Sequence, residues 1–222
     1  MEVSALRAAE GPDSIQRLTQ AALECFAERG FHGTTTRQIA EHVDMSPAAI
    51  YTHFKSKDEL LFLIMRMTLE EGLRRLTKAF DEHEEPGERL LAVVKAVVSF
   101  NAEWHTAARV ANHEIPALRG PRRASIRSLR RDIERLMEDT IERGVTAGVF
   151  ETEDVRATSF AILSMAIGVS RWFVPGGRLS SDDIGKIYAD LTLKMVSRSR
   201  IPQHVRKEPV RRARLPHQTA AA

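Results

Sequence analysis

Cysteine is nearly absent from this sequence of 222 residues, in which Cys25 is the single thiol. One cysteine cannot form a disulfide within the chain, so the protein needs no oxidising compartment and a cytoplasmic location is expected.

Long apolar runs are also missing. The most apolar segment, 160–169, is shorter than the ~20 residues of a membrane-spanning helix and contains Ser164 and Gly168. The first twelve residues lack the apolar core of a signal peptide, so we expect no secretion and no membrane partner.

Signatures of catalysis and of metal binding are missing as well. The sequence contains no serine elbow, no phosphate-binding loop and no dinucleotide fingerprint. Cys25 belongs to an apolar helical pattern, which does not suit a reactive thiol. His105, His113 and Glu114 lack the HExxH or cysteine spacing of a zinc site. We therefore expect no enzyme, no cofactor and no metal ion.

Charge of one sign is in small excess, since 33 lysines and arginines against 30 aspartates and glutamates leave a net charge of +3. Residues 198–222 hold seven of the basic residues and one acidic residue, so the rest of the chain is slightly acidic. Any argument for nucleic-acid binding must therefore come from local placement. The prolines and arginine clusters of 198–222 predict a disordered, solvated tail that could add nonspecific affinity for DNA.

Apolar residues at helical spacing fill most of the remaining sequence, and strand alternation is not found. The sequence therefore predicts an all-α fold. The expected helices are 14–29, two short ones within 36–54, and then 56–80, 88–110, 121–146, 153–173 and 181–196. The expected organisation is a flexible N-terminus (1–12), a three-helix helix-turn-helix domain (13–62), a larger helical domain (63–197) and the basic tail (198–222).

The segment 36–54 has the form of two short helices joined by a tight turn. Thr35 to Gln38 reads as a capping box, and Ser46 with Pro47 reads as the N-cap and first residue of the second helix. Asp44 occupies the turn, where a left-handed backbone is usual and aspartate is tolerated. Such a pair of helices has the geometry that fits a helix into the major groove of DNA.

The two short helices present one apolar face and one outward face. Ile39, Ala40, Val43, Ile50 and Phe54 are expected to hold them together. The residues left to contact DNA are Thr35, Thr36, Arg37, Ser46, Pro47, Ala48, Ala49, Tyr51, Thr52, His53 and Lys57. Their hydroxyl, imidazole and cationic groups suit phosphate contacts, helped by backbone N–H groups at helix starts. An ordinary helical hairpin without a DNA role is the alternative.

Residues 34–61, TTTRQIAEHVDMSPAAIYTHFKSKDELL, resemble the DNA-binding signature of TetR-family transcriptional regulators. The resemblance implies a homodimer that binds a palindromic operator, with repression as the family's usual mode. It also implies that the larger domain binds a ligand and forms the dimer. Asp44 replaces the usual turn glycine, and Ala48 and Ala49 leave few groups for hydrogen-bonded base readout. Specificity would then depend on thymine methyl contacts and DNA shape.

The last predicted helix, 181–196, has more apolar surface than one side of a small core requires. One stripe consists of Ile184, Ile187, Tyr188, Leu191 and Met195, while Leu193 and Val196 lie off it. The resemblance implies that the last two long helices form a four-helix interface with a partner chain. The stripe is the expected dimer interface, with core packing inside one protomer as the alternative.

The segment GVSRWFVPGGRLS at 168–180 resembles the C-terminal domain of TetR-family members from actinobacterial fatty-acid and steroid catabolism, several of which respond to acyl-CoA thioesters. Such an effector needs an apolar slot and cations for its phosphates. The candidates are Phe100, Trp104, Met137, Ile141, Ile162 and Met165 for the slot and Arg122, Arg123 and Arg171 for the phosphates. The apolar residues could instead be plain core.

Two other functions stay open at this point. An uncharged or cationic hydrophobic compound could be the effector, with Glu103, Glu114 and the two tryptophans forming its pocket. A helical ligand-binding or enzyme-like protein without a DNA role is the alternative of another class.

Overall fold

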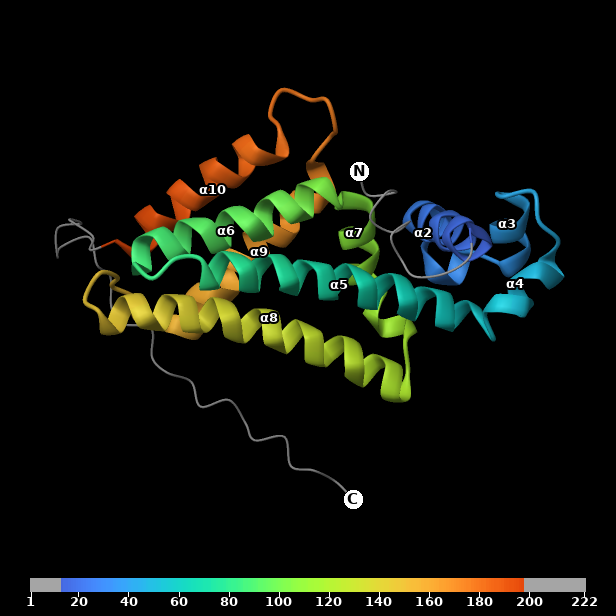
Figure 1. The fold of residues 1–222 in the computed structure, drawn as a ribbon, viewed down its shortest axis with the longest axis horizontal. Helices are drawn as coiled ribbons and strands as arrows, with labels where there is room; N and C mark the ends of the chain where they lie inside the picture. Colours follow the sequence, from blue (N-terminus) through green and yellow to red (C-terminus); the bar gives the residue numbers. More distant parts are fainter. Residues whose placement is uncertain (1–12, 198–222) are drawn as a thin grey trace, which may run out of the picture.

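The computed structural model describes residues 13–197, which form helices and no strands (Figure 1). The predicted flexible N-terminus and basic tail lie outside these residues. The elements are α2 (Asp13–Gly33), α3 (Thr36–Glu41), α4 (Pro47–His53), α5 (Lys57–Asp81), α6 (Pro86–Glu103), α7 (His105–His113), a 3-10 turn η1 (Ile115–Ala117), α8 (Gly120–Thr146), α9 (Val155–Trp172) and α10 (Ser181–Val196). The predicted all-α fold is confirmed. None of these described helices is both long and apolar enough to cross a membrane.

Local capping signals explain where several helices begin. Thr35 and Gln38 form the predicted capping box of α3, and Ser180 and Asp183 form a second capping box at the start of α10. Ser56, the N-cap of α5, forms only half of such a box. The Ser56 hydroxyl accepts from the backbone N–H of Glu59, but the Glu59 carboxylate accepts from the N–H of Lys55 instead.

The first helix is longer than its sequence pattern predicts. Gly30 leaves the helical conformation (φ 72°, ψ 167°), as expected of a glycine at a helix end. The chain then makes one further turn to Gly33 rather than entering a loop at Phe31. This turn forms because the Phe31 ring is buried and packs on Phe26, with 5.5 Å between ring centroids.

The prediction of one continuous helix over 88–110 is wrong. The helix breaks at Trp104 (φ −108°, ψ 35°), which ends α6 and starts α7. The Trp104 side chain is buried and packs on Phe100 at 5.4 Å between ring centroids. The break turns α7 toward α2, α5 and α9, where its alanine-rich face is buried.

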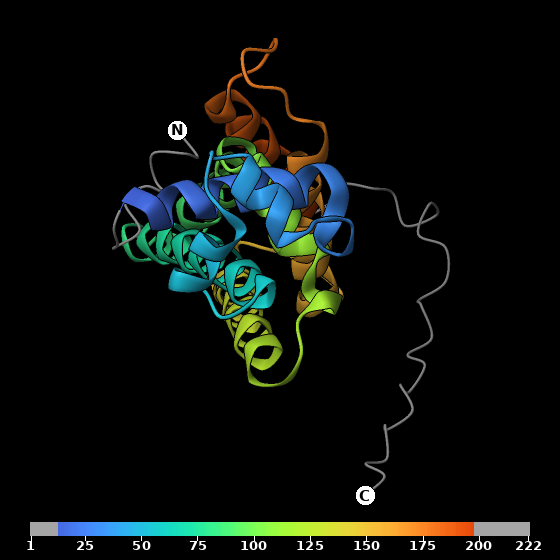
Figure 2. The same ribbon diagram turned by 90° about the vertical axis from the view of Figure 1, so that its right-hand side faces the viewer.

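The helices form a small domain at one end of an elongated bundle. In Figure 1, α5 runs from the small domain along the bundle with α8 beside it, and α10 lies outside α6. Figure 2, viewed from the small-domain end, shows α2, α3 and α4 in front of the bundle. The small domain's apolar core continues without a gap into residues of α6, α7 and α8, while a second core joins α5, α6, α8, α9 and α10.

Candidate nucleic-acid interface and ligand cavity

The turn between α3 and α4 is held by both local and distant contacts. Asp44 adopts the predicted left-handed conformation (φ 54°), and the N–H of Met45 donates to the carbonyl of Ala40 at 2.9 Å. Arg17 of α2 donates to the carbonyl of Val43 at 2.8 Å. Together these bonds fix the angle at which α4 leaves the domain.

The inward residues of the two short helices are placed largely as predicted. Ile39, Ala40 and Ile50 are fully buried and Phe54 is nearly so, whereas Val43 is only partly buried. Ile39 and Ile50 belong to the small domain's core together with residues of α2 and α5. The buried face of α4 therefore leaves its opposite face outside.

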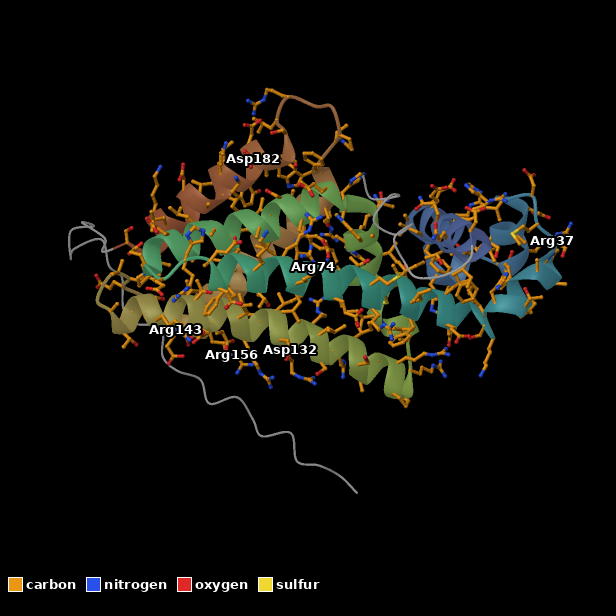
Figure 3. All side chains as sticks on the ribbon, viewed as in Figure 1. Arg37, Arg74, Asp132, Arg143, Arg156 and Asp182 are labelled. Atoms are coloured by element: carbon orange, nitrogen blue, oxygen red, sulfur yellow. The ribbon has the colours of Figure 1, made fainter. Side chains whose placement is uncertain are left out.

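Most of the residues predicted to face outward from α3 and α4 are exposed. Thr35, Arg37, Ser46, Pro47, Ala48, Tyr51, Thr52 and His53 are exposed, and Thr36 and Ala49 are half-buried. The Tyr51 hydroxyl lies 3.3 Å from the Thr36 hydroxyl and links α3 to α4, while Tyr51 is 58% exposed. Figure 3 shows Arg37 at the end of the molecule far from the bundle. We name these residues the reading face.

Two residues of the reading face have local partners that a DNA phosphate would have to displace. The Arg37 guanidinium donates to Glu41 at 2.7 Å, and this hydrogen bond raises the pKa of Arg37. The His53 imidazole lies 3.1 Å from the Ser14 hydroxyl. Both contacts lie in solvent, where such pairs are weak.

Lys57 is not placed as the sequence predicts. Its ammonium donates to the carbonyls of Phe31 at 2.6 Å and Thr34 at 2.5 Å, and it lies 4.2 Å from the Phe31 ring centroid. Burial lowers the pKa of this ammonium. Lys57 therefore joins the start of α5 to the loop between α2 and α3, and a DNA phosphate would have to compete with these two carbonyls. Local sequence could not reveal this because the loop lies more than twenty residues away.

Lys55 is the cation that sequence reasoning missed. It follows α4 directly and is exposed, and its ammonium has no partner among residues 13–197. Its position one residue after the helix-ending Phe54 was available as a signal. We add Lys55 to the reading face.

A cavity of about 120 Å³ lies inside the larger domain between α5, α6, α7, α8 and α9. Its lining residues are Thr68, Leu69, Gly72, Leu76, Val97, Phe100, Asn101, Ala108, Ala111, Asn112, Arg130, Ile133, Glu134, Phe160, Leu163, Ser164 and Ile167. Those from α5 and α6 are buried, whereas several of those from α8 and α9 are half-buried or exposed. The cavity thus has its floor on α5 and α6 and its mouth between α8 and α9.

Among the apolar residues predicted to form a slot for the effector, Phe100 lines this cavity and the others do not. Met137, Ile141 and Ile162 are buried in the second core, and Met165 packs on its edge. Trp104 lies behind Phe100 in the first core. These residues do not border the cavity in the protomer, because helical periodicity shows which face of a helix is apolar but not which part of that face borders an empty space.

The predicted phosphate-binding arginines also lie outside the cavity. Arg122 and Arg123 lie about two turns before the lining residue Arg130 on α8. Arg171 is exposed near the end of α9, where its guanidinium lies 2.7 Å from the ring of His113. Arg130, on the same helix as Arg122 and Arg123, lines the cavity.

Polar groups collect at the mouth of the cavity. Arg130 donates to the side-chain carbonyl of Asn112 at 2.8 Å. Glu134, one turn further along α8, lines the mouth and has no hydrogen-bond or ion-pair partner among the described residues. A guanidinium and a free carboxylate one helical turn apart can bind a ligand that both accepts and donates hydrogen bonds.

The four residues predicted to surround a cationic effector lie outside this cavity. The Glu103 carboxylate is held in an ion pair by Arg75 at 2.7 Å, Trp104 is buried, and Trp172 is half exposed on α9. Glu114 lies at the far end of α7, and none of the four residues lines the cavity. Within 13–197 no group of three or more His, Cys, Asp and Glu side chains could hold a metal ion.

The apolar stripe on α10 is partly inside the protomer. Ile184 is 2% exposed and packs in the second core, so it is not available to a partner. Tyr188 is half-buried, whereas Ile187, Leu191 and Met195 are 43%, 47% and 48% exposed. Phe160 and Trp172 of α9 are large apolar side chains that are also exposed.

Two helices touch both the cavity and the small domain. Leu69 of α5 lines the cavity, and the start of α5 carries Lys57. Ala111 of α7 also lines the cavity, and Arg109 of the same helix donates to the carbonyl of Ala27 in α2 at 3.4 Å. Besides the covalent link through α5, α7 therefore gives a second contact between the cavity and the domain that carries the reading face.

Two family models match this chain. Residues 18–64 match the one described as "Bacterial regulatory proteins, tetR family". Residues 83–196 match the one described as "Tetracyclin repressor-like, C-terminal domain". The first covers the domain with the reading face, and the second covers α6 to α10.

The chain is similar to several regulators. It is 29% identical over 191 residues to the HTH-type transcriptional repressor KstR2 of Mycolicibacterium smegmatis, covering 84% of this chain and 92% of that protein. The structure of the ketosteroid transcriptional regulator KstR2 of Mycobacterium tuberculosis matches with a TM-score of 0.80 at 26% identity, covering 86% of this chain and 99% of that one. These relatives are regulators of transcription, not enzymes.

A further solved structure contains both a small molecule and DNA. AibR in complex with isovaleryl coenzyme A and operator DNA matches with a TM-score of 0.73 at 24% identity. The match covers 83% of this chain and 98% of AibR. At this identity the likeness shows a shared fold.

Proposed function

The chain belongs to the TetR family of bacterial regulatory proteins, and on that premise we propose a repressor that binds a palindromic operator as a homodimer and releases it when an acyl-CoA-type effector enters the cavity. The observation that carries this proposal is that α5 and α7 both line the cavity and both contact the domain with the reading face. As a DNA-binding regulator, the protein would act in the cytoplasm.

The reading face supports DNA binding through its shape and its phosphate donors. Pro47, Ala48 and Ala49 give the start of α4 a small apolar surface that can approach thymine methyl groups. Tyr51, Ser46 and Lys55 carry donors that can reach phosphates on either side. Few side chains can form paired hydrogen bonds with bases, so DNA shape would contribute much of the specificity.

We expect Lys55→Ala and Tyr51→Ala to weaken binding to the operator and to unrelated DNA by similar factors, because phosphate contacts carry no sequence information. Loss of the lysine should also reduce the slope of log affinity against log salt by about 1. Fluorescence anisotropy over a range of salt concentrations measures both effects.

Lys78→Ala is the matched control, since Lys78 is an exposed lysine near the other end of α5. An unchanged salt slope in Lys55→Ala would remove Lys55 from the DNA contacts. Lys57→Ala should lower the thermal stability of the protein, because it leaves two loop carbonyls without their donor.

The cavity supports an effector with an apolar end and a polar, hydrogen-bonding remainder. A CoA thioester has this form: its acyl group is apolar, its pantetheine amides both donate and accept hydrogen bonds, and its phosphates are anionic. Arg130 and Glu134 at the mouth suit the amides. Arg127 and Arg131 are exposed on the same helix, have no ion-pair partner among residues 13–197, and suit the phosphates. The isovaleryl coenzyme A in the AibR structure supports this effector class.

We infer that the effector acts by moving α5 and α7. A two-fold dimer must place its two reading helices about 34–36 Å apart, or a multiple of that, to enter successive major grooves. An effector in the cavity would contact Leu69, Gly72 and Leu76 of α5 and the alanines of α7. Movement of either helix would shift the domain that carries the reading face, so the arrangement that binds the effector would differ from the one that binds the operator.

Reciprocity between the two ligands follows from this mechanism. Operator DNA should weaken effector binding by the same factor by which the effector weakens operator binding. Isothermal titration of a CoA thioester into the free protein and into the operator complex measures the factor, which is typically about 5- to 150-fold. Equal thioester affinities in the two titrations would exclude the mechanism.

A further inference from the structure

Phe100 lies among the residues that form the floor of the cavity, and three neighbours pack against its ring. On one side it lies against α5 at Gly72, where an added Cβ would be 3.1 Å from the ring atom Cε1. Next to it lies Trp104, at 5.4 Å between ring centroids. The Arg75 guanidinium lies 5.4 Å from the Phe100 centroid. The ring therefore has no empty space into which it can withdraw from the cavity.

The guanidinium beside this ring is itself fixed. Arg75 donates to Glu71 of α5 and to Glu103 of α6, both at 2.7 Å. These bonds tie the two helices together directly behind Phe100. The floor of the cavity thus consists of two helices joined to each other by ion pairs, whereas the mouth consists of exposed or half-buried side chains of α8 and α9.

The size of the cavity limits what can reach this floor. Its volume is about 120 Å³. A dry apolar cavity of about 150 Å³ accommodates a benzene ring, and typical pockets for larger ligands have volumes of roughly 300–1,000 Å³. A long fatty-acyl chain or a fused-ring steroid exceeds the space between the mouth and Phe100.

We propose that Phe100 sets the length of the acyl group, so that the effector is a CoA thioester with a short or compact acyl group of about six carbons or fewer. This inference rests on the proposed effector class and adds the substituent and the residue that selects it. In this arrangement the acyl group ends on the Phe100 ring and the thioester and pantetheine remain near Arg130 and Glu134.

Titration of the full-length protein with saturated straight-chain CoA thioesters of two to twelve carbons tests the proposal, with CoA alone as the baseline. Each methylene that enters the cavity should strengthen binding by about fourfold, until the chain reaches the floor. We expect the tightest binding at four to six carbons and weaker binding for longer chains. Phe100→Ala should raise the affinity for octanoyl-CoA about tenfold.

Three further variants separate chain-length selection from altered stability. Phe100→Leu keeps a large apolar side chain and should shift the optimum in the same direction as Phe100→Ala. Gly72→Ala pushes the ring toward the cavity and should favour shorter chains. Val98→Ala is the matched control, because Val98 is buried in the same helix but does not line the cavity.

The outcomes distinguish the two proposals. If thioesters of ten or more carbons bind best, or if the Phe100 and Val98 variants share one optimum, the length limit is wrong while the effector class stands. If no thioester binds more tightly than CoA alone, both the effector class and the length limit are wrong.

Discussion

Replacing Leu191 with arginine is expected to give a monomer that has lost most of its affinity for the operator. Leu191 lies between Ile187 and Met195 on one face of α10, and all three side chains are more than two-fifths exposed in the protomer. Large exposed apolar side chains that share one helix face indicate an interaction surface. An arginine at the centre of such a surface would be buried without a partner.

The loss of operator affinity follows from the number of half-sites that one particle can contact. A dimer binds its second half-site as an intramolecular event, which strengthens binding by roughly 10²- to 10⁴-fold without any new contact. A monomer loses this gain although its reading face is unchanged. We expect operator affinity to fall by at least about 100-fold.

Sedimentation velocity and an operator shift assay on the same preparation test this prediction. Asp190→Arg is the matched control, because it puts the same side chain on the same helix at an exposed position in the groove between α6 and α10. A Leu191→Arg protein that sediments as a dimer would place the interface elsewhere. A monomer with native operator affinity would exclude the requirement for a dimer.

Replacing Gly144 with alanine is expected to cause the largest loss of stability from a single methyl group. A Cβ at Gly144 in α8 would lie 1.9 Å from the Cδ2 atom of Phe150. The Phe150 ring is buried in the second core, and the N–H groups of Val149 and Phe150 both donate to the Gly144 carbonyl, at 2.9 and 3.0 Å. The ring cannot move away without breaking this turn. We expect a loss of about 3 kcal/mol in the free energy of unfolding.

Urea denaturation monitored by circular dichroism measures this loss. Gly168→Ala is the control, since Gly168 is also helical but has no atom within 4 Å of its Cβ position in the protomer. Alanine is the better helix former by about 0.8–1.0 kcal/mol, so Gly168→Ala should be neutral or stabilising. Similar denaturation midpoints for the two variants would contradict the close approach of Phe150 to α8.

The sequence by itself determined the features that depend on near neighbours along the chain. Two helices are capped through residues only three positions apart, Thr35 with Gln38 and Ser180 with Asp183. Because all the interacting atoms belong to the motif itself, the motif is enough to predict the start of the helix. Asp44 marks the turn because few residues tolerate a left-handed backbone. The outward set on α4 follows from the apolar positions on its other face.

Tertiary structure alone decided the features that depend on what packs opposite a helix. Trp104 breaks a pattern that is helical on both sides, because its ring is buried against Phe100. Lys57 turns inward to carbonyls more than twenty residues away in sequence. Met137 fills the core while Leu163 lines the cavity, although both occupy apolar helix faces. A single sequence shows which side of a helix avoids water, but the partner on that side comes from distant segments that local spacing does not record.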